Sequence, residues 1–137
     1  MNIRFYNPNK DFFGLEKLLK ETSLYYEPID KEDIFKAQIK HDPKSIIIAE
    51  EKGRIIGTIF ILYNPWQSFI YHLGVHPEYR NCGIGDKLMD KAEKILKKRS
   101  IKQPTLFIEK DNEKIIEFYK KRDWFVLYEV LCMEKKI

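Results

Sequence analysis

Cysteine is scarce in this chain of 137 residues, which has only Cys82 and Cys132. The two do not form the C-x-x-C spacing of metal or redox sites, so we expect free thiols. Long apolar runs are missing too, since no stretch approaches the roughly 20 residues that cross a bilayer. The start of the chain has no basic region followed by an apolar core of the secretory type. We therefore expect a cytoplasmic protein that does not bind a membrane.

An excess of one charge is also absent. The chain has 25 Lys and Arg against 21 Asp and Glu, for a formal net charge of +4. The lysines are spread along the sequence and form no basic block, which disfavours nucleic acid as a partner. No cluster of His, Cys and Asp has the spacing of a metal site, so we expect no metal.

What the chain does have is the composition of a folded globular protein. Hydrophobic residues make up 44% of it and aromatic residues 14%. This length suits one compact core and leaves little room for a second. No internal repeat or linker interrupts it. We therefore expect residues 1–137 to form a single domain.

Hydrophobic periodicity predicts an alternation of strands and helices. After a first strand over residues 3–6, Asn7-Pro8-Asn9 supplies capping chemistry for a helix through Leu19, and Asp30 for a second helix that ends near His41. Glu51-Lys52-Gly53 is typical of a hairpin turn. The remaining strands are expected over 45–50, 54–63, 68–75, 105–109 and 124–133, and the remaining helices over 83–99 and 113–121. The order is β-αα-βββ-α-β-α-β, an α/β (α+β) fold.

A glycine-containing loop precedes the helix expected over residues 83–99. Gly83 and Gly85 remove side chains where the backbone enters this helix, so its N–H groups can close around an anion at the positive end of the helix dipole. The pattern lacks the G-x-x-x-x-G-K of a P-loop and the third glycine of a dinucleotide fingerprint. Pyrophosphate binding without nucleotide hydrolysis is the chemistry indicated. The loop reads Arg80-Asn81-Cys82-Gly83-Ile84-Gly85.

With its context, this loop resembles the Gln/Arg-x-x-Gly-x-Gly/Ala motif of the GNAT (Gcn5-related N-acetyltransferase) superfamily. The segment 73–79 before it resembles the strand and turn that precede the motif in the family. Residues 112–119 resemble the family's Asn-x-x-Ala-x-x-Phe/Leu-Tyr segment, with Ile115 in place of the usual alanine. The resemblance covers nearly the whole chain and implies one GNAT-like domain with a mixed, mostly antiparallel central sheet flanked by helices.

The resemblance also implies a cofactor site and an activity. Acetyl-CoA would be the co-substrate of an N-acetyltransferase acting on a primary amine of a small molecule or peptide, and a homodimer is compatible with it. Asp86 is unexpected beside a pyrophosphate, because like charges repel. The implied cofactor-binding residues are Leu73, Gly74, Val75, Arg80, Asn81, Cys82, Gly83, Ile84, Gly85, Asp86, Asn112 and Tyr119.

Tyr119 matches the position where many family members place the general acid that protonates the departing thiolate. A strand interruption near Gly74 could leave a backbone N–H free to polarise the thioester carbonyl. The general base stays open, because the strand position where many relatives have glutamate lacks a carboxylate here. Tyr71, His72, Glu109 through water, or no protein base remain as alternatives, with Tyr71 and His72 expected on opposite strand faces.

Two further features qualify these expectations. Asp123 stands before Trp124 where the family commonly has glycine, and aspartate tolerates the left-handed conformation such a turn needs. Cys82 lies in a loop where the backbone binds the ligand, which disfavours a role as nucleophile. The missing carboxylate and Asp86 also leave a second function open: a CoA-binding regulatory or interaction module with little or no catalysis.

Overall fold

The computed structural model describes residues 1–137 and divides them into two compact units, Met1–Leu106 and Phe107–Ile137. The first unit is built on a four-stranded sheet with the strands in the order β1-β2-β3-β4. These strands are β1 Asn2–Phe5, β2 Ile46–Glu51, β3 Arg54–Leu62 and β4 Phe69–Val75, and each neighbouring pair is antiparallel. The first four expected strands are thus confirmed.

The turn between β2 and β3 is the hairpin that the sequence predicts. Glu51 pairs with Arg54, and the two residues between them have positive φ, 50° at Lys52 and 77° at Gly53. Two central residues in the left-handed region make a tight turn whose twist matches that of the flanking strands.

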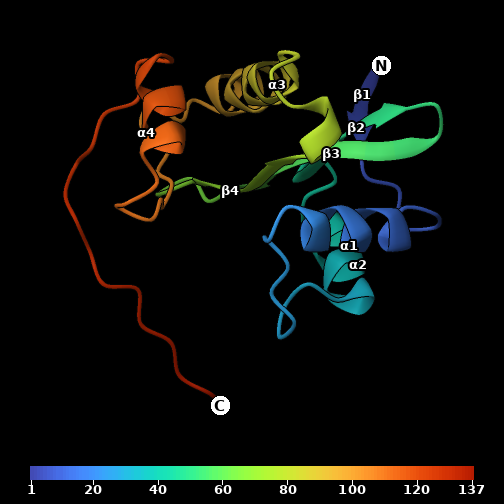
Figure 1. Cartoon of the computed structure of the whole chain (residues 1–137). Helices are drawn as coiled ribbons and strands as arrows, with labels where there is room; N and C mark the ends of the chain where they lie inside the picture. The colour runs from blue at the N-terminus through green and yellow to red at the C-terminus, as the bar shows by residue number, and fades with distance from the viewer. The chain divides into compact units, whose positions relative to one another are not determined.

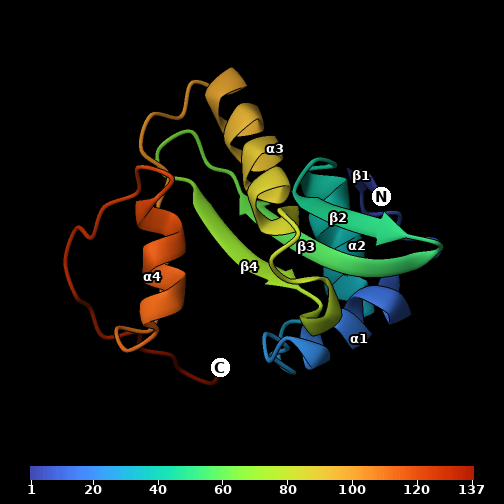
Figure 2. The same cartoon turned by 45° about the horizontal axis from the view of Figure 1, so that its top comes forward.

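Helices cover both faces of this sheet. Figures 1 and 2 show α1 (Phe12–Glu21) and α2 (Glu32–His41) on one face and α3 (Ile84–Lys98) on the other. The core on the α1 and α2 face contains Leu15, Leu18, Leu19, Phe35, Ile46, Ile48 and Phe60. On the other face, α3 buries the apolar stripe of Ile84, Leu88, Met89, Ala92, Ile95 and Leu96.

The start of α1 differs from the expectation that Asn7 to Asn9 would cap it. The helix begins at Phe12 after Asp11, and the Asp11 side chain makes no capping hydrogen bond. The Asp11 carboxylate instead accepts hydrogen bonds of 2.7 and 3.0 Å from the Arg4 guanidinium on β1, and one of 2.7 Å from the Asn7 N–H. Arg4 also pairs with Glu50 on β2. The Asp11 carboxylate therefore forms an ion pair with Arg4 and does not cap α1.

The second unit contains α4, Glu113–Lys120. The Asn112 side chain caps this helix by accepting a hydrogen bond of 3.3 Å from the Ile115 N–H. At its other end, Asp123 adopts a φ of 66°, as expected for an aspartate in place of glycine, and the Trp124 N–H donates to the Tyr119 carbonyl.

Two of the expected strands are not formed. Within residues 105–109, Thr105 alone makes one parallel bridge, to Phe69 of β4, and residues 124–133 carry no strand. Alternating apolar residues indicate what a segment could bury, but a strand exists only where a neighbour completes its hydrogen-bond ladder. The mixed α/β class is confirmed, and the strands that do form end with β4. None of the helices has both the length and the apolar character needed to cross a membrane.

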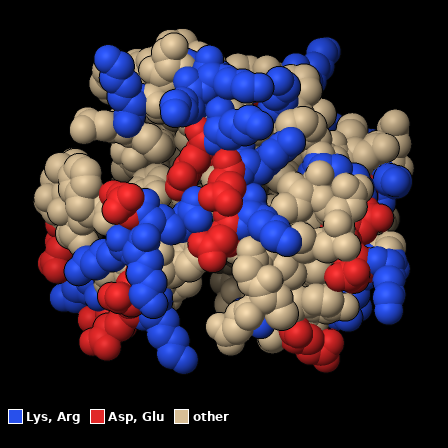
Figure 3. Space-filling view, turned by 90° about the horizontal axis from the view of Figure 1, so that it is seen from above, with Lys and Arg blue, Asp and Glu red and all other residues tan.

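Charges of both signs share the surface around α3. Figure 3 shows basic and acidic side chains side by side on the face seen from above. On α3 itself, Asp86 lies in the first turn and Lys97 and Lys98 in the last, which suits the helix dipole. On this face, acidic side chains therefore interrupt the basic ones.

Candidate functional site

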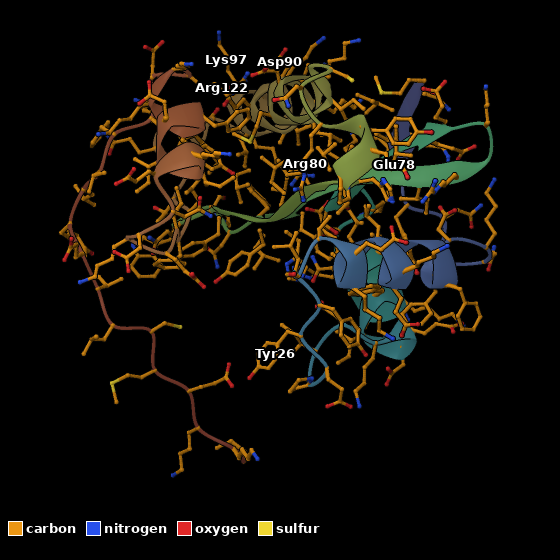
Figure 4. All side chains as sticks on the ribbon, viewed as in Figure 1. Tyr26, Glu78, Arg80, Asp90, Lys97 and Arg122 are labelled. Carbon is orange, nitrogen blue, oxygen red and sulfur yellow. The ribbon has the colours of Figure 1, made fainter.

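The connection from β4 to α3 is held by hydrogen bonds within its own residues. After β4, a short 3-10 helix covers Pro77–Tyr79 and is capped by His76, whose Nδ1 accepts a 3.1 Å hydrogen bond from the Glu78 N–H. Arg80 then turns back, and its Nε donates to the Val75 carbonyl at 3.1 Å. Figure 4 shows Glu78 and Arg80 on this segment. The loop therefore enters α3 in a fixed conformation.

The N-terminus of α3 is left open to an anion. Gly83 is the N-cap residue, has a φ of 79°, and has no side chain to cap the first turn. Asn81 also has a positive φ, 61°. A Cβ placed on Gly83 would meet no atom within 4 Å, so space surrounds the backbone here. Uncapped N–H groups at a helix start, with positive-φ residues before them, form the kind of cradle that binds a phosphate.

The residues present thus fit a pyrophosphate group as the sequence predicted. Arg80, Asn81, Cys82, Gly83 and Asp86 are exposed, while Ile84 is buried and anchors the helix to the sheet. The Cys82 thiol donates to the Arg80 carbonyl at 3.5 Å.

β4 is the last strand of the sheet, and it carries a bulge. The pairing with β3 shifts register between Thr58 and Phe60, and opposite that shift His72 adopts a φ of 50°. The sequence predicted an interruption near Gly74, and in the structure the interruption lies two residues earlier, at His72. Gly74 pairs regularly with Thr58, and its missing side chain makes room for a neighbour: an added Cβ would lie 2.7 Å from Leu24 Cδ1.

His72 is paired with a buried carboxylate. Its Nε2 lies 3.0 Å from both Oδ1 and Oδ2 of Asp30. The sequence predicted Asp30 as the cap of α2, but the N-cap residue is Lys31 and the Asp30 carboxylate turns inward. It also accepts a 2.7 Å hydrogen bond from the Tyr26 N–H. Tyr71, the other strand candidate, is 40% exposed.

The second unit carries the remaining expected site residues. Tyr119 is 7% exposed and makes edge-on ring contacts with Phe118 at 5.1 Å and Trp124 at 5.7 Å. Burial in α4 fixes the position of the Tyr119 ring. A general acid needs such a fixed ring, but an aromatic residue that only packs in the core has one too. Asn112 serves locally as the helix cap, and Glu109 is exposed.

Sequence patterns missed two residues of this region. His76 lies between β4 and the 3-10 helix, is buried, and has its Nε2 3.1 Å from Glu21 Oε2. A histidine directly before a Pro-initiated turn was the available signal, because that is a capping position. Asp30 gave no signal of its tertiary partner, since an aspartate before a helix has the same pattern whether it caps or not.

Comparison with known proteins agrees with this geometry. The Acetyltransferase (GNAT) family matches residues 12–124. Acetyltransferase SG1711 of Sodalis glossinidius is 31% identical over 137 residues, which cover 100% of this chain and 96% of that protein. Acetyltransferase YPTB2753 of Yersinia pseudotuberculosis is 31% identical over 124 residues, covering 90% and 87%.

Solved structures share the fold. Ard1 from Thermoplasma volcanium superposes with a TM-score of 0.79 at 25% identity, over 93% of this chain and 84% of that one. The PaiA N-acetyltransferase from Thermoplasma acidophilum, in complex with coenzyme A, gives 0.73 at 22% identity, over 88% and 87%.

The family match and the acetyltransferase relatives place the chain in the class of acyltransferases that take their acyl group from a CoA thioester. The chain belongs to the acetyltransferase (GNAT) family. It is an N-acetyltransferase with acetyl-CoA as its donor, and the resemblance seen in the sequence is confirmed.

Proposed function

We propose that this enzyme moves an acetyl group from acetyl-CoA to a primary amine of a small molecule or peptide, by direct attack of the amine on the thioester. The observation that carries this proposal is the uncapped start of α3 behind Gly83, joined to the edge strand β4 through the bond from Arg80 to the Val75 carbonyl. One continuous segment thereby offers binding groups for both the pyrophosphate and the pantetheine arm of the cofactor.

Residues 80–86 would hold the pyrophosphate of the cofactor. Their support is the backbone geometry of Asn81 and Gly83 together with the positive dipole end of α3. Leu73, Gly74 and Val75 would hold the pantetheine arm through backbone groups, since β4 has no further strand beside it in the sheet order. Asn112 joins this set on the family motif alone. Acetyl-CoA, when bound, supplies the activated acetyl carbonyl.

Tyr119 is our candidate for the general acid. Its phenol would give a proton to the departing sulfur, and this rests on its match to the family's tyrosine position. A phenol and a thiol have similar ordinary pKa values, about 10 and 8.5, so the transfer is feasible. Tyr71 and His72 are the candidates for accepting the amine's proton.

We further propose that residues 1–137 act as one cytoplasmic domain. The family match runs continuously across the boundary between the two compact units, from residue 12 to residue 124. Both cysteines are free and exposed, which suits a reducing compartment.

The test of the acid is the substitution Tyr119→Phe, which removes the hydroxyl and keeps the ring packing. We expect kcat to fall about a hundredfold while CoA binding, followed by calorimetry, stays within about twofold. Tyr128→Phe is the matched control, since Tyr128 is an exposed tyrosine of the same unit. A Tyr119→Phe enzyme that turns over as fast as the parent at every pH would show that Tyr119 is not the acid.

A further inference from the structure

We propose that Asp30 is a positioning residue that makes His72 the base of the reaction, with His72 Nδ1 taking the proton from the acceptor's ammonium group. This rests on the proposed function and assigns a role that sequence patterns left open among Tyr71, His72 and Glu109. Asp30 stands directly before α2, far from His72 in the sequence, and its pairing with His72 is visible in the structure alone.

Asp30 presents an unusual carboxylate. It is 3% exposed, and of the side chains that bond to it, His72 is the one that can carry a positive charge. The remaining bond comes from the Tyr26 N–H. A buried carboxylate costs free energy unless a partner compensates it. The His72 imidazole is therefore the side-chain partner that compensates this buried carboxylate.

His72 is held in place from three sides. The Asp30 carboxylate holds Nε2, the Phe60 ring of β3 packs edge-on at 5.0 Å, and the bulge fixes the backbone. A non-glycine residue with positive φ inside a strand is strained, and such strain persists where the surroundings enforce it. The bulge also changes the strand alternation, and the His72 side chain, 13% exposed, faces Asp30.

The bond to Asp30 selects the tautomer. A carboxylate accepts hydrogen bonds, so Nε2 carries the hydrogen and Nδ1 of the neutral ring keeps its lone pair. Both hydrogen bonds of the His72 ring to Asp30 are made by Nε2. His76 provides the contrast in the same chain: its Nε2 lies 3.1 Å from Glu21 and 2.8 Å from a guanidinium nitrogen of Arg54, while its Nδ1 accepts from the Glu78 N–H. Both histidines are paired with a carboxylate, but His72 alone has a nitrogen ready for a proton.

The proposed step balances as follows. His72 Nδ1 takes one proton from the ammonium, and the freed nitrogen lone pair forms the C–N bond at the thioester carbonyl. The C–S bond then breaks with its electron pair moving to sulfur, which the Tyr119 hydroxyl protonates. The attacking nitrogen then loses a second proton, which returns through solvent to the Tyr119 phenolate. His72 releases the first proton to solvent. The products are the amide and the free CoA thiol.

The test measures kcat/KM against pH for the parent, His72→Gln and Asp30→Asn, with acetyl-CoA and an alkylamine taken from a panel of primary amines. At pH 7 we expect a loss of about a hundredfold for His72→Gln and about tenfold for Asp30→Asn. Both losses should shrink as the pH rises toward about 10, where an alkylamine loses its proton without help. A purely structural role would give a loss that does not depend on pH.

Asp42→Asn is the matched control. Asp42 is also a buried aspartate beside α2, but at the opposite end, and it pairs with Arg99. The ratio of kcat/KM for Asp42→Asn to kcat/KM for the parent should stay constant across the same pH range. Losses for His72→Gln and Asp30→Asn that stay constant with pH would overturn the assignment while leaving the acetyltransferase function intact. Absence of CoA release from the parent with every amine would overturn the proposed function and this inference together.

Discussion

At the scale of single residues, buried aspartates link the helix ends to the rest of the first unit. Asp11, Asp30 and Asp42 flank α1 or α2, and all are buried. The sequence predicted Asp30 as a cap, because an aspartate before a helix can accept from its free N–H groups. In the structure, each carboxylate bonds a distant side chain instead, namely Arg4, His72 and Arg99. Local chemistry alone could not reveal this, since the partners come from elsewhere in the sequence.

The pair of Asp42 and Arg99 gives a prediction about acid stability. Burial alone would raise the pKa of Asp42, but hydrogen bonds from Arg99 at 2.7 and 2.9 Å and from the Lys44 N–H outweigh it, so the pKa lies below its usual value. A carboxyl whose pKa is lower in the folded state stabilises the protein above its unfolded pKa of about 3.9. That contribution disappears as the pH falls through the folded value.

We therefore expect Asp42→Asn to lower the free energy of unfolding by about 1.5–3 kcal/mol at pH 7. The difference from the parent should narrow below about pH 4, as the parent's own carboxyl takes up a proton. Urea unfolding at a series of pH values measures both. Asp111→Asn, at an exposed position, should change stability by less than about 0.5 kcal/mol. A difference that stays the same down to pH 2 would contradict the role of this ion pair.

At the scale of elements, the connection from β4 to α3 is the part that the sequence predicts best. The glycines, the amphipathic stripe of α3 and the preceding strand all lie within one continuous segment, so local patterns suffice. The sequence predicted a strand interruption near Gly74, but not its position at His72, because that arises from the register between β3 and β4, which tertiary packing decides. The same limit applies to residues 124–133, where an alternating pattern predicted a strand that the structure does not form.

Comparing two glycines separates the role of the loop before α3 in cofactor binding from the backbone strain that a substitution there causes. Gly83 and Gly53 have nearly equal φ, 79° and 77°, and an added Cβ would meet no atom within 4 Å at either position. Each substitution to alanine should therefore cost about 1–2 kcal/mol of stability from backbone strain alone. We expect Gly83→Ala also to raise the Kd for CoA about tenfold, because it perturbs the phosphate cradle, while Gly53→Ala leaves it unchanged. Calorimetric titration with CoA and thermal unfolding give both quantities. Equal Kd values for the two variants would exclude Gly83 from the cofactor site.

At the scale of the whole molecule, the chain has two compact units. The proposed cradle for the pyrophosphate and the Asp30 and His72 pair lie in the first, and Tyr119, the proposed acid, lies in the second. The family match spans both, which is why the class of enzyme is clear although the motifs lie far apart in the sequence. The acceptor is a different matter. Backbone groups in short, recognisable motifs are proposed to bind the donor acetyl-CoA, so the sequence can predict that site. An acceptor pocket depends on side chains from several parts of the chain, which a short motif does not reveal.

The most direct test of the central claim is acetyl transfer itself. Purified protein is incubated with acetyl-CoA labelled in its acetyl group and a panel of primary amines, including alkylamines, aminoglycosides and short peptides. Free CoA and labelled products are then quantified by mass spectrometry. We predict that at least one amine gains a single labelled acetyl group in equal amount to the CoA released. Tight binding of acetyl-CoA with no labelled product from any amine would contradict the account.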